Sequence, residues 1–288
     1  MRIINLMEDT EGANGCIFEH GLSFYIETKK HKLLLDTGAS GKTLKNAEML
    51  GIDLTQVDTV ILSHGHYDHS GGIMAFAEIN PNAKIYLQRS ARYDYYNLKD
   101  NKEKYIGIDK AILELPQVQL LDGNCSIDEE LFLFTNVTGR KYWAKSNLLL
   151  KRKVEGEFVQ DVFDHEQCLV ITEEDKHVLL SGCAHNGILN ILEAYNSYFD
   201  KQPSMVISGF HLIKKEAYDE EEIQMIQDTA RELQKYHTMF YTGHCTGIPA
   251  YDIMKEIMQE KLVFVHSGMT VYEDKTCING QNRTKTSC

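Results

Sequence analysis

The chain of 288 residues carries 42 acidic and 30 basic side chains, which gives a net charge of −12. This charge repels phosphate backbones and anionic lipids, so we expect a small-molecule substrate and neither nucleic acid nor membrane as a partner. The composition, 43% hydrophobic and 25% charged, excludes a disordered or fibrous chain. No apolar run approaches the roughly 18 residues of a membrane helix, and no signal-peptide region is visible. We therefore expect a soluble cytoplasmic protein, and the oligomeric state stays open.

The seven cysteines are odd in number, scattered, and without a C-x-x-C pair. They are Cys16, Cys125, Cys168, Cys183, Cys245, Cys277 and Cys288. A chain of this length does not need disulfides for stability, so we predict free thiols in a reducing compartment.

Short apolar or β-branched runs predict strands in the N-terminal half, with amphipathic helices between some of them. The predicted strands cover residues 2–6, 22–28, 31–36, 59–63, 84–87 and 131–135, and the helices cover 42–50 and 72–78. This order is a meander with inserted helices rather than a regular βαβ alternation.

The segment around 90–125 is rich in tyrosine and charge and shows no clean period. We interpret it as an inserted lid-like or substrate-facing segment, with a solvated linker as the alternative. No Pro/Ser-rich linker and no internal repeat divides the chain, so residues 1–288 are predicted to form a single domain.

The C-terminal half repeats the pattern of short strands and helices. Strands are predicted at 168–171, 177–180, 205–208, 239–242 and 262–266, and helices at 187–198, 216–235 and 249–259.

The strongest chemical signal is His64-Gly-His66-Tyr-Asp68-His69, directly after the strand at 59–63. Residues two apart do not share a helix face, so His64 and His66 converge only if this stretch is a loop. Imidazole and carboxylate are ligands of zinc and related ions, and four such groups in six positions can fill two adjacent coordination spheres. Asp68 lies near the start of the next helix, where a negative charge is favoured.

Together with other motifs, this pattern resembles the metallo-β-lactamase superfamily over nearly the whole chain. The motifs are Glu19–Ser23, Leu35–Gly38, Ser63–His69, Gly182–His185, Gly209–Leu212 and Gly243–Gly247. They are similar to the branch of metal-dependent hydrolases of β-lactamase superfamily II that includes the 7,8-dihydropterin-6-yl-methyl-4-(β-D-ribofuranosyl)aminobenzene 5′-phosphate synthase-like proteins. The resemblance implies an α+β fold, the four-layer αββα sandwich, with metals at one edge between the sheets.

The resemblance also implies which side chains bind metal. His64 and His66 match ligands of the first ion, Asp68 and His69 match ligands of the second, and His244 matches the last ligand position of the superfamily.

The chain departs from the family pattern at Cys183, which stands where most superfamily hydrolases have an aspartate that bridges both ions. We predict His185 as the third ligand of the first ion. The competitor is His165, whose spacing to Cys183 is similar to that of the superfamily's usual third histidine, although its setting between Asp164 and Glu166 favours a surface position.

Other polar residues of these motifs are expected around the metals. We predict that Asp36 orients a ligand imidazole. His211 is a candidate for substrate binding, with a structural role as the alternative, and Glu19 and His20 are expected to shape the mouth of the pocket.

These observations predict a binuclear hydrolase with two divalent ions, zinc first and manganese or iron as alternatives. The ions would generate a metal-bound hydroxide at neutral pH, and Asp68 would hold the water and move its proton. The resemblance favours an ester or phosphoester of a small anionic molecule that is phosphorylated, pterin-like or nucleotide-like. The alternatives are a di-iron redox enzyme, a nucleic-acid processing nuclease of the same fold, and a binding protein that has lost catalysis.

Overall fold

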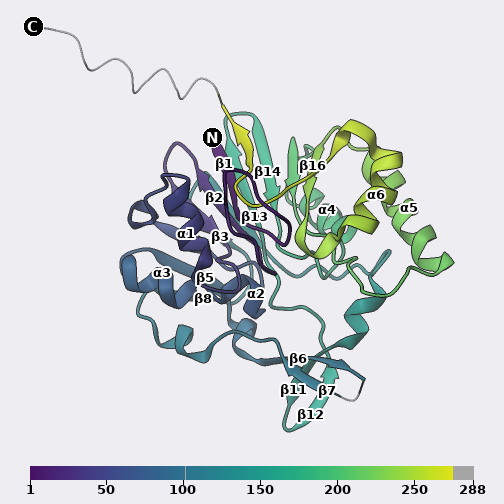
Figure 1. Cartoon of the computed structure of the whole chain (residues 1–288), viewed down its shortest axis with the longest axis horizontal. Helices are drawn as coiled ribbons and strands as arrows, with labels where there is room; N and C mark the ends of the chain where they lie inside the picture. Colours follow the sequence, from purple (N-terminus) through teal and green to yellow (C-terminus); the bar gives the residue numbers. More distant parts are fainter. Residues whose placement is uncertain (101, 275–288) are drawn as a thin grey trace, which may run out of the picture.

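The computed structural model describes residues 1–100 and 102–274, and its centre is a pair of seven-stranded sheets packed face to face (Figure 1). The first sheet has the order β18 (Thr270–Glu273), β1 (Arg2–Met7), β2 (Ser23–Glu27), β3 (Lys32–Leu35), β4 (Thr59–Ile61), β5 (Lys84–Gln88) and β8 (Val118–Leu121). The second has the order β17 (Leu262–Phe264), β16 (Met239–Thr242), β15 (Met205–Ile207), β14 (Lys176–Leu180), β13 (Cys168–Glu173), β10 (Leu131–Phe134) and β9 (Cys125–Ser126).

Helices cover the outer face of each sheet, which completes the predicted αββα sandwich (Figure 1). The first sheet is covered by α1 (Lys42–Met49) and α3 (Ile73–Ile79), with the short α2 (Tyr67–Ser70) at its edge. The second is covered by α4 (Ile188–Asn196), α5 (Glu220–Gln234) and α6 (Ile248–Met258).

The central strands read as continuous apolar runs because both of their faces are buried. In β3, Leu33 and Leu35 belong to the cluster between the two sheets, whereas Leu34 belongs to the cluster under α1 and α3. Side chains alternate along a strand, so one apolar run supplies two cores at once.

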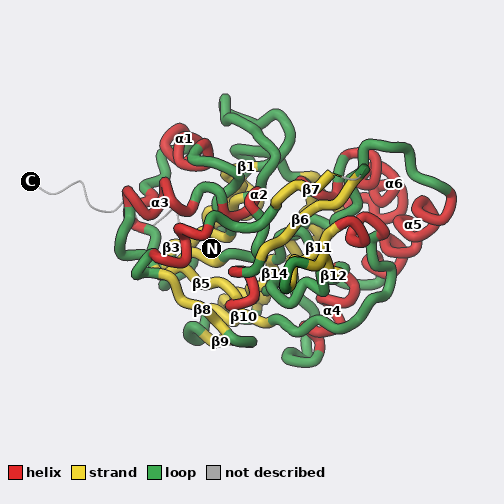
Figure 2. Tube along the Cα trace, turned by 90° about the horizontal axis from the view of Figure 1, so that it is seen from below, coloured by secondary structure: helices red, strands yellow, loops and turns green. Residues whose placement is uncertain are grey.

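A third sheet, with the order β12–β11–β6–β7, lies at one edge of the sandwich near α2 (Figures 1 and 2). Its strands are β6 (Asp94–Lys99), β7 (Lys102–Tyr105), β11 (Leu150–Val154) and β12 (Glu157–Gln160). The predicted insert at 90–125 is therefore wrong in its bounds: its first part enters this small sheet, but β8 belongs to the first large sheet. Half of the small sheet is supplied from beyond residue 145, by pairing across a long sequence distance.

The long acidic helix α5 begins four residues later than the sequence suggests. Asp219 caps it: its carboxylate accepts the backbone N–H of Glu222 at 2.8 Å, and the Glu222 carboxylate accepts the N–H of Asp219 at 2.9 Å. This reciprocal pair fixes the helix start, since it satisfies two of the first free N–H groups. Within the described part of the chain, no helix has the length and apolar character needed to cross a membrane.

Five cysteines are free thiols, as predicted: Cys16, Cys125, Cys168, Cys183 and Cys245. Cys277 and Cys288 lie outside the described residues.

Candidate metal centre

The candidate ligands lie on loops that follow strand ends at one edge of the sandwich. Strands β3 and β4 run parallel in one sheet, and β14, β15 and β16 run parallel in the other, so the residues after them gather at common edges. Asp36 follows β3, the histidine loop (residues 64–69) follows β4, Cys183 and His185 follow β14, His211 follows β15, and His244 follows β16.

The histidine loop is irregular up to His66, as predicted, and then enters α2 with Asp68 in the first turn. Close backbone approach brings it to the second sheet. A Cβ atom on Gly182 would lie 2.1 Å from Ser63 Oγ and 3.0 Å from His64 Nδ1, so only glycine allows this contact.

His64 and His185 point their Nε2 atoms at each other, 3.2 Å apart. Ser63 Oγ donates its proton to Asp36 and therefore accepts one from His64 Nδ1. On the other ring, Asn147 donates to the carbonyl oxygen of His185, so its own amide oxygen faces His185 Nδ1, at 3.1 Å, as an acceptor. Both Nδ1 atoms hold the ring proton, and two Nε2 lone pairs face each other.

A second group has the same arrangement. His69 Nδ1 donates to Asp36 Oδ2 at 2.7 Å, and His244 Nδ1 donates to Asp9 Oδ1 at 2.6 Å. The Nε2 atom of His244 then faces the carboxylate of Asp68, at 3.4 Å from Oδ2.

Cys183 joins the two groups. Its Sγ lies 3.2 Å from His69 Nε2, and it lies within 4.8 Å of the ligand atoms of His64 and His185 on one side and of His69 and His244 on the other. The side chain is buried. It therefore occupies the position between the two groups that a bridging ligand would take.

This donor set fits divalent cations. Two ligand atoms on a tetrahedral zinc ion lie about 3.3 Å apart, close to the observed separation of the His64 and His185 nitrogens. Burial lowers the pKa of both rings well below its ordinary value, which keeps them neutral and able to coordinate. At His244, burial lowers the pKa but the carboxylates of Asp68 and Asp9 outweigh it, so this position favours a positive charge.

His66 lies beside the first group, but its ring nitrogen falls within 4.8 Å of Asp161 and His165 rather than within the group of His64, Cys183 and His185. Its ring centre lies 4.6 Å from that of His64 and 4.8 Å from that of His185. Burial lowers its pKa to about 3, and its buried Nε2 has no hydrogen-bond partner among the described residues.

His165 is buried, so the expected surface position is wrong. Its Nδ1 accepts the backbone N–H of Gly65 at 2.9 Å, and its Nε2 donates to Asp161 Oδ2 at 3.1 Å. Both ring nitrogens are engaged, so the structure favours His185 over His165 as a ligand, and His165 instead supports the backbone between His64 and His66.

Sequence reasoning missed the acidic residues after β1. Glu8 is buried and accepts the backbone N–H of His244, while Asp9 holds the side chains of both His244 and His20. Two acidic residues after a strand carry no motif, and only the packing of β1 beside the end of β16 gives them this role.

His20 lies closer to the centre than expected for a residue of the mouth. Its Nε2 is 3.3 Å from Asp68 Oδ2, its ring stacks on His244 at 5.0 Å, and about half of the side chain is exposed. Glu19 points away and pairs with Ser40 and Lys42.

His211 lies beside the centre, with its ring 4.1 Å from that of His185. Both of its ring nitrogens are buried and have no hydrogen-bond partner among the described residues. Cys245 accepts its backbone N–H at 3.3 Å. This position is compatible with the predicted substrate contact.

Backbone strain is concentrated at the same edge. Asp36, Ala184, His211 and His244 have φ between 48° and 59°, in the left-handed region. This conformation costs a residue with a side chain about 1 kcal/mol. Strain of this kind persists where surrounding contacts impose it, as they do at functional sites.

Asp36 is expected to be essential for both stability and metal binding. Its buried carboxylate accepts hydrogen bonds from Ser63 N, Ser63 Oγ and His69 Nδ1, each at 2.7 Å. In Asp36→Asn, the asparagine tolerates the left-handed backbone at position 36. Its NH₂ group, however, would face hydrogen-bond donors that now donate to a carboxylate oxygen. We expect a loss of about 3 kcal/mol in the free energy of unfolding, measured with urea, and a 10- to 100-fold weaker metal affinity.

The matched control is Asp53→Asn, which replaces an exposed cap that asparagine fulfils equally well. An Asp36→Asn protein with unchanged stability and metal affinity would contradict the orienting role.

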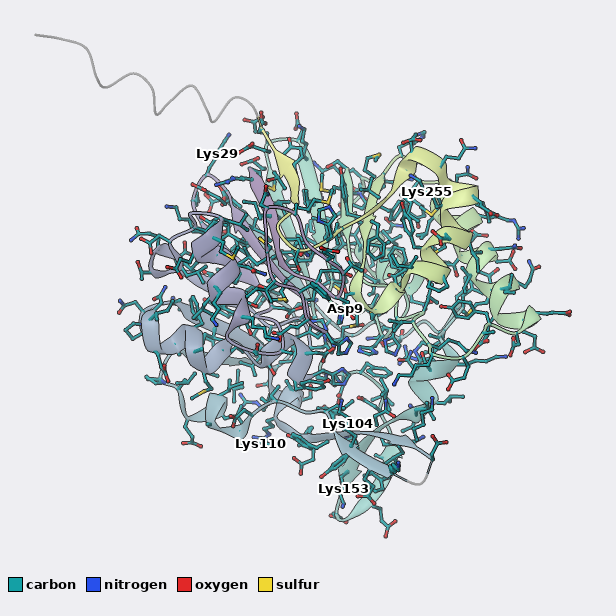
Figure 3. All side chains as sticks on the ribbon, viewed as in Figure 1. Asp9, Lys29, Lys104, Lys110, Lys153 and Lys255 are labelled. Carbon is teal, nitrogen blue, oxygen red and sulfur yellow. The ribbon has the colours of Figure 1, made fainter. Side chains whose placement is uncertain are left out.

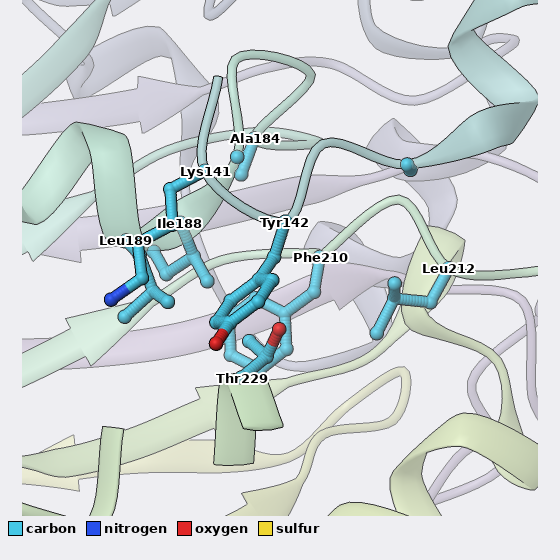
Figure 4. A pocket seen from close by; sticks show the side chains of 10 residues that line it. Lys141, Tyr142, Ala184, Ile188, Leu189, Phe210, Leu212 and Thr229 are labelled. Carbon is cyan, nitrogen blue, oxygen red and sulfur yellow. The ribbon is translucent and has the colours of Figure 1, made fainter. Parts of the chain in front are cut away.

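The pocket in Figure 4 is separate from this cluster. Ala184, Tyr142, Ile188, Phe210 and Thr229 are among the residues that line it. None of its lining side chains belongs to a candidate metal group, so it is not the candidate centre.

Comparisons with known proteins agree with the fold. The family model described as the metallo-β-lactamase superfamily matches residues 17–145. The chain is 31% identical to Tm1679, described as a metal-dependent hydrolase of the β-lactamase superfamily, with a TM-score of 0.78 over 95% of this chain and 99% of that one. It is 28% identical to the 7,8-dihydropterin-6-methyl-4-(β-D-ribofuranosyl)-aminobenzene-5′-phosphate synthase of Methanocaldococcus jannaschii, over 94% of this chain and 96% of that protein.

Proposed function

The chain belongs to the metallo-β-lactamase superfamily, and from this premise we propose that it is a binuclear metal-dependent hydrolase of an ester or phosphoester. The substrate we propose is a small anionic molecule, phosphorylated and pterin- or nucleotide-like. The name of the M. jannaschii relative, which contains both a pterin and a 5′-phosphate, supports this class. The net charge of −12 favours a small molecule over nucleic acid.

The observation that carries the proposal is the set of four histidine Nε2 atoms that point toward one another and toward Cys183. The protons of His64, His69, His185 and His244 are held on Nδ1 by partners outside the cluster. Imidazole together with the Cys183 thiol is a donor set that suits zinc better than magnesium or calcium. We therefore propose zinc as the native metal, with manganese or iron as alternatives.

Bound divalent ions would lower the pKa of a coordinated water and polarise the bond under attack. The chain's own part is to position these reactants. In this proposal, Asp68 Oδ2 orients the water and accepts its proton. His20 Nε2 lies 3.3 Å from that oxygen, and its side chain is partly open to solvent, which supports a role in exchanging this proton with the solvent.

The test is metal content per chain by elemental mass spectrometry, combined with hydrolysis of bis(p-nitrophenyl) phosphate and p-nitrophenyl acetate. We expect near two equivalents of metal, loss of turnover on chelation, and its return with Zn²⁺ or Mn²⁺. His66→Ala should lose turnover, whereas His237→Ala, at an exposed position, should keep it. Turnover that survives both the chelator and His66→Ala would overturn the proposal.

A further inference from the structure

The small sheet turns one of its faces toward the metal centre. In the β6–β7 pair, Asn97 stands directly opposite Lys104, and residues opposite each other in an antiparallel pair share a face. Tyr95, two residues before Asn97, is on that face as well. Its side chain is fully buried, with its ring 4.2 Å from His165 and 6.1 Å from His66. Lys104 and Asn97 therefore lie on the inner face.

The other face of the small sheet turns away from the centre. Lys153 stands opposite Phe158 on this face, and the rings of Tyr96, Tyr105 and Phe158 contact one another there. The Lys153 ammonium lies 4.9 Å from the Phe158 ring. Figure 3 shows Lys104 on the side of the small sheet nearer to Asp9, and Lys153 farther from it.

Lys104 is held directly over the histidine loop. Its Nζ lies 3.0 Å from Tyr67 Oη and 4.7 Å from the centre of the Tyr67 ring. The backbone N–H of Tyr67 donates to Ile106 O at 2.9 Å, which ties the end of β7 to the start of α2. Tyr67 directly precedes Asp68, and its ring centre lies 6.5 Å from that of His20.

The charge of Lys104 is left without a counter-ion. Lys99 and Lys110 each pair with a carboxylate, at 2.7 Å and 2.9 Å, but Lys104 has none within 4 Å among residues 1–100 and 102–274. On the cross-strand partner of Lys104, the buried Oδ1 of Asn97 has no hydrogen-bond partner within the same described ranges.

We infer that Lys104, Tyr67 and Asn97 form a subsite that binds a phosphate group of the substrate, remote from the bond that is cleaved. The inference rests on the proposed hydrolase and defines which end of its substrate faces the small sheet. Lys104 supplies the charge, Tyr67 Oη supplies a donor, and Asn97 Oδ1 accepts a neighbouring hydroxyl. The substrate would extend past Tyr67 and His20 to Asp68.

The test uses the metal-loaded protein and two esters with the same p-nitrophenol leaving group: a neutral pentanoate and a 4-phosphonobutyrate. The readout is the ratio of kcat/KM for the charged ester to that for the neutral ester. Lys104→Ala should lower this ratio about tenfold, which is the expected effect of losing one charge-assisted hydrogen bond. Lys104→Arg should restore most of the ratio. The control Lys153→Ala removes an equal charge from the outer face and should keep the ratio within about twofold.

A second arm does not depend on turnover: calorimetric titration of 4-phosphonobutyrate into wild type and Lys104→Ala. We expect about tenfold weaker binding to the variant. Equal binding to both proteins, or no binding to wild type, would overturn the subsite. Binding that depends on Lys104 while neither ester is hydrolysed would support the subsite and overturn the proposed hydrolysis of such esters.

Discussion

Replacing His185 with alanine is expected to remove one of two metal equivalents and to lower hydrolysis about a thousandfold. The reason is the orientation of the ring. Asn147 holds the Nδ1 proton, Phe163 stacks on the ring at 4.6 Å with an interplanar angle of 4°, and Nε2 is left facing His64 Nε2. Alanine leaves the first ion with one fewer imidazole on a loop that cannot supply another.

The measurement is metal content and kcat/KM on the same preparations, with His177→Ala as the matched control. His177 is also a buried imidazole, but it lies in β14 and bonds Tyr195 Oη at 2.6 Å, away from the cluster. The control should keep both its metal and its activity. Full metal content and turnover in His185→Ala would contradict the assignment. Loss of metal in His165→Ala alone would transfer the ligand role to His165.

The sequence predicted the central strands of the two large sheets because these strands are buried on both faces, but it missed the edge strands β8, β9 and β18. Continuous apolar runs such as residues 31–36 are then a sufficient signal. The small sheet gave no such signal. Its strands expose one face, and β6 pairs Asn97 with Leu150, more than 50 residues away. A local sequence pattern cannot indicate a strand partner at that distance. The sequence therefore predicted a lid or a linker for the tyrosine-rich segment.

The sequence also predicted only part of the candidate site. The histidine loop was predicted because its ligands are adjacent in sequence. Spacing could not decide between His165 and His185, since both lie within the same cluster of rings. Hydrogen bonding decides between them, because Gly65 and Asp161 occupy both nitrogens of His165. The roles of Glu8 and Asp9 depend on contacts to His244 more than 230 residues later, which no local pattern encodes.

Cys183 is expected to set both the occupancy of the centre and its metal preference. Burial, together with nearby Cys245, raises the pKa of its thiol, so the thiolate forms when a cation is bound to it. Its Sγ is common to both ligand groups. Cys183→Ser replaces this donor with a hydroxyl, and we expect a loss of about one metal equivalent and about a hundredfold lower kcat/KM.

Cys183→Asp should be compared with Cys183→Ser. A carboxylate can contact both groups but is a harder ligand than a thiolate, so it favours manganese relative to zinc or cadmium. We expect Cys183→Asp to hold more metal than Cys183→Ser, and its activity with Mn²⁺ relative to Zn²⁺ to rise about tenfold over wild type. The measurement is kcat/KM after reconstitution of the metal-free protein with each ion in turn.

The matched control is Cys168→Ser, which changes a buried thiol in β13 that belongs to no candidate metal group. It should keep the wild-type metal content and the wild-type preference among ions. If Cys183→Ser also keeps both, the thiol is a bystander. The lone pairs of His64, His69, His185 and His244 would then have to hold their ions without a bridging sulfur, and the wild-type preference would follow from imidazole and Asp68 alone.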